Sequence, residues 1–214
     1  IEAHAGSGAH ALISTPGAGK WYRSNGHRSI QRIALEVEPD AALEWLPQET
    51  IFFDDADVVL DTTIRLHGNA RYLGCEILCF GRTAAGERFG RGRIRQHIRV
   101  LRDGRPIWLE QGTLAGGSAQ MTSQLGLGGH TVCASLVAVG LPSSAALMGH
   151  LRDAGQQAAA GRGQFGATQM KAVTVVRYLG DSSEVARAVM LAAWGQLRPA
   201  LLAREARPLR IWNT

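Results

Sequence analysis

Leu43-Glu-Trp-Leu-Pro-Gln-Glu-Thr-Ile-Phe-Phe53 places large apolar side chains beside two carboxylates and a single proline. Pro47 lacks a backbone N–H and would clash with a preceding helical turn, so the stretch is not one continuous helix. Runs of aromatic and β-branched residues are typical of strands, and proline is accepted at strand ends and bends. The stretch therefore predicts two short strands that meet at a bend near Pro47.

A weak repeat extends this pattern through the first hundred residues. Three similar units begin at Ile1, Ile33 and Thr62. Each unit is an alternating strand, a turn residue followed by alanine, and a second apolar strand, with the turn residues being Gly8, Asp40 and Asn69. Units of about 30 residues that cannot bury their own apolar face suggest stacked β layers. A plain meander of hairpins in a sandwich is the alternative that three imperfect copies leave open.

The C-terminal third has a different pattern. Pro142-Ser-Ser144 predicts the start of a helix that runs through Arg152 and ends near Gly155. Residues 155 to 169 are poor in bulky apolar side chains and predict a mobile loop, followed by a strand. Asp181 is expected to cap a last long helix, with Glu184 as its capping-box partner.

These elements together predict one mainly β domain over residues 1–214. Residues 1–140 form the β stack, and residues 141–214 form a helix-loop-strand-helix region. The expected fold class is β-helix-like, or stacked antiparallel β layers, with about two α-helices in the C-terminal third. The 26 glycines, most of them between short apolar runs, favour turn-rich β structure over a helical bundle.

The composition bounds the environment and the partners. Three cysteines cannot all pair within one chain, so a reducing compartment, and hence a cytoplasmic location, is expected. No apolar run approaches the roughly 20 residues that a membrane span requires, so no membrane association is expected. The chain starts at Ile1 within a strand-like pattern, which indicates that a preceding segment is missing.

Arginine dominates the basic residues. The net charge is +5, and only Lys20 and Lys171 are lysines among the 23 basic side chains. In residues 91–100 four arginines and His97 alternate with Gly92, Ile94, Gln96, Ile98 and Val100, which predicts a half-buried strand with a basic outer face. A solvated face is the default interpretation and a docking surface for an acidic partner is the second. RNA ranks third, because no aromatic residues are interleaved with the arginines.

Motifs for catalysis or tight metal binding are weak. The glycine-rich run before Lys20 lacks the spacing of a phosphate-binding loop. Cys75 and Cys79 lie too far apart along one strand to share an ion and are interpreted as buried free thiols. The seven histidines show no close ligand spacing. His130, in a glycine-rich loop, is the candidate for a transient metal contact.

Three glutamates stand out because each lies in an otherwise apolar strand. They are Glu49, Glu76 and Glu110. Either they lie on the solvent side of half-buried strands, or they face inward and need an arginine, a cation or water as a partner. Carboxylates of this kind also permit a β-solenoid glycoside hydrolase, which requires two of them flanking a cleft. A basic RNA-binding β domain is the other alternative.

The sequence also resembles a known family through five segments that occur in the family's order. These are Thr15-Pro-Gly-Ala-Gly-Lys-Trp-Tyr-Arg-Ser24, Leu43-Glu-Trp-Leu-Pro-Gln-Glu49, Glu76-Ile-Leu-Cys-Phe-Gly-Arg82 with Gly86-Glu-Arg-Phe89, Val176-Arg-Tyr-Leu-Gly180 and Arg210-Ile-Trp-Asn-Thr214. They are similar to the urease accessory protein D (UreD/UreH) family, whose members carry several dozen further residues before the position of Ile1.

The resemblance implies a non-enzymatic role in inserting nickel into apo-urease. The family is a scaffold that joins the urease subunits to the accessory proteins F and G, with no nucleic acid among its partners. Its fold is similar to a β-helix-like stack with added helices. An internal passage is thought to conduct nickel, so no tightly bound cofactor is expected, only nickel in transit.

A conduit must hold a divalent ion weakly, so scattered carboxylates and water suit it better than a cage of Cys and His ligands. We therefore predict that Glu76, Glu110 and Glu49 face an internal water-filled passage. The turn Tyr22-Arg23-Ser24 and the C-terminal Trp212 are the candidate partner contacts.

Overall fold

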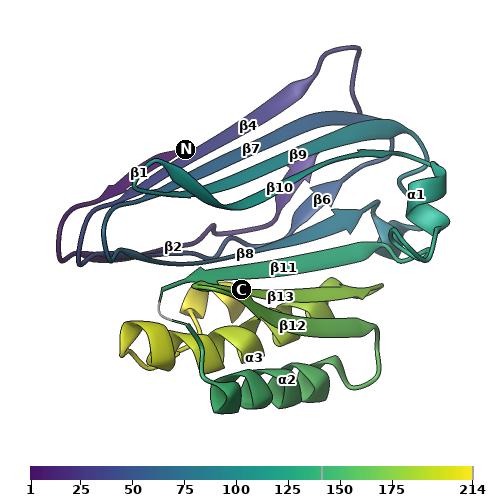
Figure 1. Cartoon of the computed structure of the whole chain (residues 1–214). Helices are drawn as coiled ribbons and strands as arrows, with labels where there is room; N and C mark the ends of the chain where they lie inside the picture. Colours follow the sequence, from purple (N-terminus) through teal and green to yellow (C-terminus); the bar gives the residue numbers. More distant parts are fainter. Residues whose placement is uncertain (141, 214) are drawn as a thin grey trace.

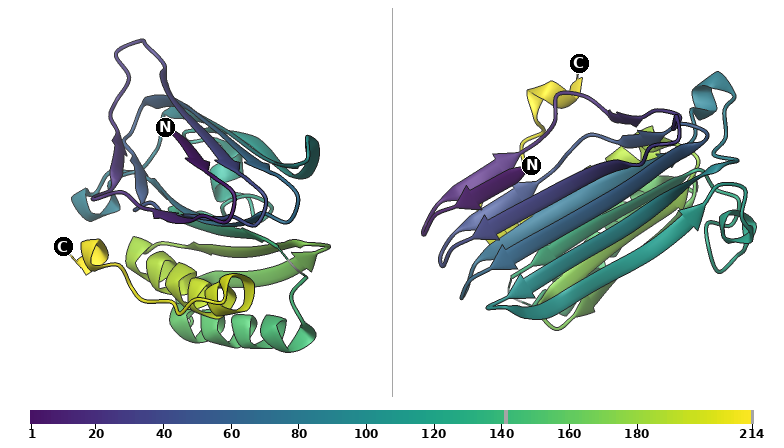
Figure 2. Two further views of the ribbon diagram at one scale, coloured as in Figure 1. Left: turned by 90° about the vertical axis from the view of Figure 1, so that its left-hand side faces the viewer. Right: turned by 90° about the horizontal axis from the view of Figure 1, so that it is seen from above.

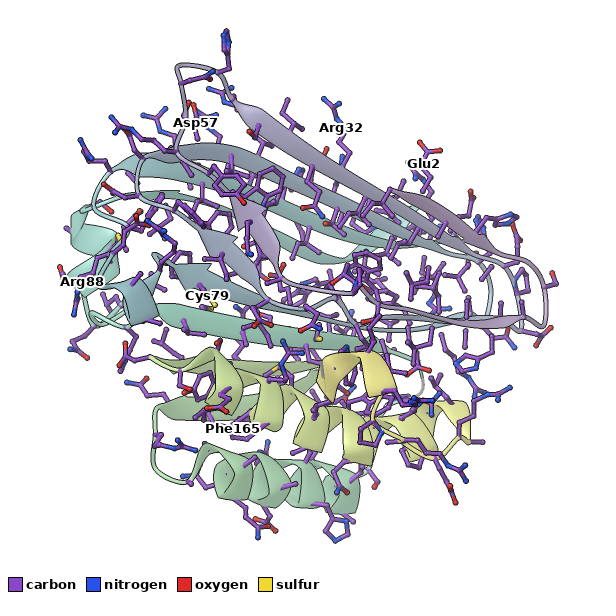
Figure 3. The ribbon with its side chains drawn as sticks, turned by 180° about the vertical axis from the view of Figure 1, so that it is seen from behind. Glu2, Arg32, Asp57, Cys79, Arg88 and Phe165 are labelled. Carbon is purple, nitrogen blue, oxygen red and sulfur yellow. The ribbon has the colours of Figure 1, made fainter. Side chains whose placement is uncertain are left out.

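The computed structural model describes residues 1–140 and 142–213, which form two β-sheets and a layer of helices stacked in that order (Figure 1). The upper sheet has the strand order β1 (Glu2–Ala5), β4 (Ser29–Val37), β7 (Ala56–Leu66), β9 (Gly92–Arg102) and β10 (Arg105–Ala115). The first four strands are parallel, and the hairpin β9–β10 closes the sheet. Glu2 and Arg32 project outward from this sheet (Figure 3).

The lower sheet combines parallel and antiparallel strands. Its order is β12 (Gln164–Met170), β13 (Val173–Gly180), β11 (Val132–Val139), β8 (Arg71–Phe80), β5 (Ala42–Trp45) and β2 (His10–Ile13). Two further strands, β3 (Gly19–Trp21) and β6 (Thr50–Phe52), extend it beside the second half of β8. The helices α2 (Ala145–Ala159) and α3 (Ser183–Leu202) cover its lower face, as the end-on view in Figure 2 shows. Short helices are η1 (Thr83–Ala85), α1 (Ala119–Thr122) and η2 (Arg210–Asn213).

The predicted repeat is a set of stacked rungs. In each rung a strand of the upper sheet turns over into a strand of the lower sheet, giving β1–β2, β4–β5 and β7–β8. Equivalent positions of successive rungs lie side by side, since Ala5 pairs with Val37 and Val37 with Leu66. The mainly β, β-helix-like fold class is confirmed. The turns contain Gly8, Asp40 and Gly68 at positive φ, so the left-handed residue of the third turn is Gly68 and not Asn69.

Three apolar clusters hold the layers together, two between the sheets and one below the lower sheet. Between the sheets, the inner residues of β4, β7 and β9 pack on Leu43, Trp45 and Tyr72 of the lower sheet. Below the lower sheet, Leu73, Ile77 and Leu136 pack on α2 and α3. The strands of the lower sheet that lie between these clusters are therefore apolar on both faces, as fully covered strands require.

Three local predictions are wrong. Helix α2 continues through Gly155 to Ala159, because the missing Cβ at Gly155 admits the Phe165 ring, which lies between the lower sheet and α2 (Figure 3). Most of the predicted loop over residues 155–169 is therefore the end of α2 and strand β12. The cap of α3 is Ser182, whose hydroxyl accepts a hydrogen bond from the Val185 N–H, because Asp181 is engaged by His130 and Thr131.

The bend at Pro47 is confirmed, and it leaves an opening in the lower sheet. Strand β5 pairs with β8 only as far as Trp45 beside Gly74, and β6 resumes the pairing at Thr50 beside Leu78. On this side, the described residues between them provide no strand partner for residues 75–77 of β8. The segment from Leu46 to Glu49 bridges the interruption.

Candidate functional site

A row of polar residues crosses the inner face of the lower sheet. Glu76 of β8 lies directly beside Ser135 of β11, and Ser135 lies beside Arg177 of β13. Side chains that are opposite one another on neighbouring strands share a face. In this row the shared face is the one turned toward the upper sheet.

Two residues of the upper sheet, Gln96 and Glu110, contact this polar row from the opposite side. The Gln96 amide of β9 donates a hydrogen bond of 2.5 Å to a carboxylate oxygen of Glu76. A guanidinium nitrogen of Arg177 lies 2.9 Å from a carboxylate oxygen of Glu110 on β10. Glu76 and Glu110 therefore meet between the sheets, together with one cation and one amide.

This polar cluster adjoins a cavity between the sheets. The cavity has a volume of about 120 Å³, enough for several water molecules, and Glu76 and Ser135 line it together with Gln31 and Thr62 of the upper sheet. Its lining also includes Gly19, an exposed residue of β3, so the cavity reaches the surface on that side. Glu76 retains accessible surface within the protein because it borders this space.

The electrostatics of the cluster keep Glu76 close to neutrality. Burial, and next the negative charge of Glu110, raise the pKa of Glu76 to about 7, against the opposing effects of Gln96 and Arg177. A carboxyl group with such a pKa exchanges its proton near neutral pH and can exchange it for a cation at little cost. Burial also raises the pKa of the neighbouring Cys75 thiol to about 12, so this side chain stays protonated and is a poor metal ligand.

A second, smaller cavity lies below the opening in the lower sheet. Its volume is about 20 Å³, room for about one water molecule. Pro47 and Cys75 line both cavities, so the bend at Pro47 separates them. Trp194 and Arg187 of α3 and Trp212 of the C-terminal segment complete the lining of the second cavity.

Comparisons with known proteins identify the family of the chain. A family model described as UreD urease accessory protein matches residues 1–213. The chain belongs to this family. It is 55% identical over its whole length to the urease accessory protein UreD of Janthinobacterium sp. (strain Marseille), of which it covers 72%. It is 46% identical to the protein of the same name from Nitrosospira multiformis and covers 77% of it.

Two residues predicted to line the passage lie elsewhere in this UreD family member. Glu49 pairs with Arg187 of α3, below the lower sheet, and lines neither of the two cavities described above. His130 lies 2.9 Å from Asp181, and neither residue borders these cavities. The structure thus brings Glu76 and Glu110 together but not Glu49 or His130, and of these four residues only Glu76 is part of a cavity lining.

Sequence reasoning missed one buried carboxylate. Glu44 of β5 is fully buried between the lower sheet and α3, where it accepts hydrogen bonds from the Trp194 indole at 2.6 Å and from Arg198 at 3.0 Å. A ring nitrogen of His10 lies 2.7 Å from the same carboxylate. The alternation of Leu43, Glu44 and Trp45 already indicated that Glu44 faces away from the inter-sheet core.

The predicted partner contacts differ in exposure. Tyr22, with 66% of its surface exposed, lies on the loop between β3 and β4 that rises above the upper sheet in Figure 1. Phe53 supports the Tyr22 ring edge-on at a centroid distance of 4.8 Å. Arg23 lies 3.3 Å from Asp55, and the Ser24 hydroxyl donates to the His27 carbonyl within the same loop.

Trp212 packs on the body of the chain. Its indole N–H donates to the Ser14 hydroxyl at 2.9 Å, and its ring meets Trp194 edge-on at a centroid distance of 6.0 Å. The C-terminal segment is thereby fixed over the second cavity.

The arginine face of β9 is largely paired with carboxylates. Arg91 pairs with Asp54 at 2.9 Å, and Arg99 pairs with Asp61 at 3.0 Å. These pairs join β9 to β7 or to the turn before β7, so the predicted alternation is confirmed and its charge is locally compensated.

Proposed function

We propose that this chain acts in urease maturation by passing nickel through its interior toward apo-urease while joining urease to the accessory proteins F and G. Membership of the family supports the maturation role. The observation that carries the conduit is Glu76, a carboxylate enclosed between the sheets that borders a cavity reaching the surface.

The chemistry of this cavity suits transit better than storage. Its lining includes the carboxylate of Glu76 and the hydroxyl groups of Ser135 and Thr62, oxygen donors that bind divalent nickel weakly. Arg177 compensates Glu110 and limits the negative charge available to a cation. The protonated Cys75 thiol provides no strong ligand. A nickel ion in this cavity is therefore expected to bind weakly at several positions, without a complete set of strong ligands at any of them.

The conduit is tested by urease activation. Cells or reconstituted mixtures carrying Glu76→Ala or Glu110→Ala should deliver much less nickel to urease, while the variants still co-purify with the accessory proteins and urease. Glu205→Ala is the matched control, because Glu205 is an exposed glutamate whose partner Arg207 is also exposed. Full urease activation by the Glu76 and Glu110 variants would refute the conduit.

Partner binding is proposed to use the Tyr22 loop. An exposed aromatic ring supported from behind is typical of interface anchors. Ser24 is engaged within the loop and shapes it, so Tyr22→Ala should weaken pull-down of protein F or of urease more than Ser24→Ala does. Equal, undiminished pull-down by both variants would remove this surface from the proposal.

The two alternative functions have less support. The central cavity, at about 120 Å³, is smaller than the several hundred Å³ that small-molecule sites usually occupy, whereas a glycosidase needs an open cleft between its carboxylates. An RNA-binding face would need uncompensated cations, whereas Arg91, Arg95 and Arg99 lie beside aspartates. The three free cysteines agree with the proposed cytoplasmic location. None of the described helices has the length and apolarity of a membrane span.

A further inference from the structure

A second group of metal-ligating side chains lies outside the cavities, on the outer face of the upper sheet. Ligand atoms of Glu36, Glu38 and His67 all lie within 4.8 Å of one another. His4 joins this group through Glu38, since its ring nitrogen lies 3.1 Å from a Glu38 carboxylate oxygen. These residues are here called the rung-end cluster: His4, Glu36, Glu38 and His67.

The stacked rungs position the rung-end cluster. His4 of β1 and Glu36 of β4 are direct neighbours in the parallel register. His67 follows the last residue of β7 and donates its backbone N–H to the Val37 carbonyl at 2.9 Å, which sets it beside Glu38. Ile33, Leu35 and Val37 alternate inward to the core, so Glu36 and Glu38 face outward. The four residues thus come from the ends of β1, β4 and β7, and these strand ends lie at the left of Figure 1, where the rungs turn over.

The distances fit inner-sphere ligands of one ion. Two donor atoms that share a metal, each about 2.1 Å from it, lie roughly 3–3.5 Å apart. The His4–Glu38 and His67–Glu36 pairs are both separated by 3.1 Å. Rotation of side chains that are a third or more exposed can bring the remaining donors to the same spacing. Two imidazoles with two carboxylates favour borderline ions such as Ni²⁺, Co²⁺ or Zn²⁺ over Mg²⁺ and Ca²⁺.

The pairing of charges in the rest of the chain provides an independent argument. Most carboxylates with a described ion pair have a guanidinium partner, as Asp54, Asp61 and Glu87 do. Glu36 and Glu38 instead have only imidazole partners among the ion pairs of the described residues, although Arg65 is the cross-strand neighbour of Glu36. Although the chain is rich in arginine, Glu36 and Glu38 have no guanidinium partner among the described ion pairs. Their two negative charges can therefore balance the charge of a divalent cation. We propose that the rung-end cluster binds one borderline divalent transition-metal ion, separately from the central cavity.

The site is tested by adding Co²⁺ to the whole chain with labelled histidine and following the ring signals by NMR. The His4 and His67 signals should broaden first, at less than one equivalent, before those of His150. His150 is an exposed histidine on α2 outside the cluster. Simultaneous broadening of all exposed histidines would overturn the proposal.

Substitutions then separate this site from the conduit. Glu36→Gln with Glu38→Gln, and separately His67→Ala, should weaken Ni²⁺ or Co²⁺ binding at this site by about 10-fold or more, while His150→Ala leaves it unchanged. Glu76→Gln should also leave the His4 and His67 broadening unchanged. Unaltered affinity in both cluster variants would refute the site, whereas loss of nickel delivery in Glu76 variants concerns only the proposed conduit.

Discussion

Glu76 of β8 and Gln96 of β9 are joined across the space between the two sheets by a hydrogen bond of 2.5 Å. The amide satisfies one oxygen of a carboxyl group that burial and Glu110 keep near its neutral form. A neutral acid between the sheets avoids most of the cost of a buried charge. The same group gains its full charge when a cation replaces the proton.

Glu76→Gln should make stability less sensitive to pH. With its pKa raised to about 7, folded Glu76 retains a proton that the unfolded chain releases above its usual value of 4.5. The stability of the wild-type protein therefore falls as pH rises from about 4.5 to 7 and stays lower above that range. At pH 8 the substitution should raise the free energy of unfolding by on the order of 2–3 kcal/mol, with little change at pH 4. Urea unfolding at both pH values checks this, and an equal effect at both would contradict it.

Glu44→Gln should destabilise the junction of β5 and α3. The substitution leaves Arg198 without its counter-charge in a largely buried setting, where only 13% of the arginine side chain is exposed. Loss of one partner of a buried pair costs about 3–5 kcal/mol. Glu205→Gln, in the exposed pair with Arg207, should change stability by less than about 1 kcal/mol. Thermal unfolding of both variants provides the comparison, and similar small losses would show that the Glu44 pair is not a stabilising contact.

Gly155→Ala should disturb the packing of α2 on β12. A Cβ at this position would lie 2.1 Å from the Phe165 ring, so the ring must move. Overpacking of this kind costs about 1–3 kcal/mol, less the helix propensity gained by alanine. Combining the change with Phe165→Leu should recover part of the loss, because the two positions are in contact. Strict additivity in denaturant unfolding would mean that the ring does not cause the loss.

Trp212→Ala should release the C-terminal segment from the body. The variant loses the ring contact with Trp194 and the hydrogen bond to Ser14, together worth about 1–3 kcal/mol. Hydrogen exchange in residues 204–213 should accelerate, while exchange in α3 changes little. Trp212→Phe keeps the ring but lacks the N–H, so it should have an intermediate effect. Unchanged exchange in both variants would show that the segment is held by other contacts.

The sequence predicts those features that depend on near neighbours in the chain. Pro47 marks the bend because proline has no backbone N–H to donate to a neighbouring strand, and the repeated turn residues reveal the rungs. By contrast, the prediction that Asp181 caps the last helix was wrong. Helix-capping preferences consider only nearby residues, whereas the partner of Asp181, His130, lies 51 positions away. A local rule cannot weigh such a distant competitor.

The candidate site was predictable only in part for the same reason. An apolar strand with a single glutamate indicates an unusual carboxylate, and this identified Glu76 and Glu110. Their meeting depends on the registers of β8, β11 and β13, which no local pattern encodes. Glu49 has the same local pattern as Glu76, yet it pairs with Arg187, which lies 138 residues away.

The interruption in the lower sheet has a mechanical consequence. Strand β8 is held by β5 before residues 75–77, by β6 after them, and by β11 along their other side. The interruption at Pro47 is therefore bordered by paired strands, and the segment from Leu46 to Glu49 crosses it. In the proposed conduit, passage across the sheet at this point would need no strand to detach, so substitutions in the bridging segment should alter delivery of nickel while the strand pairing of β8 is kept.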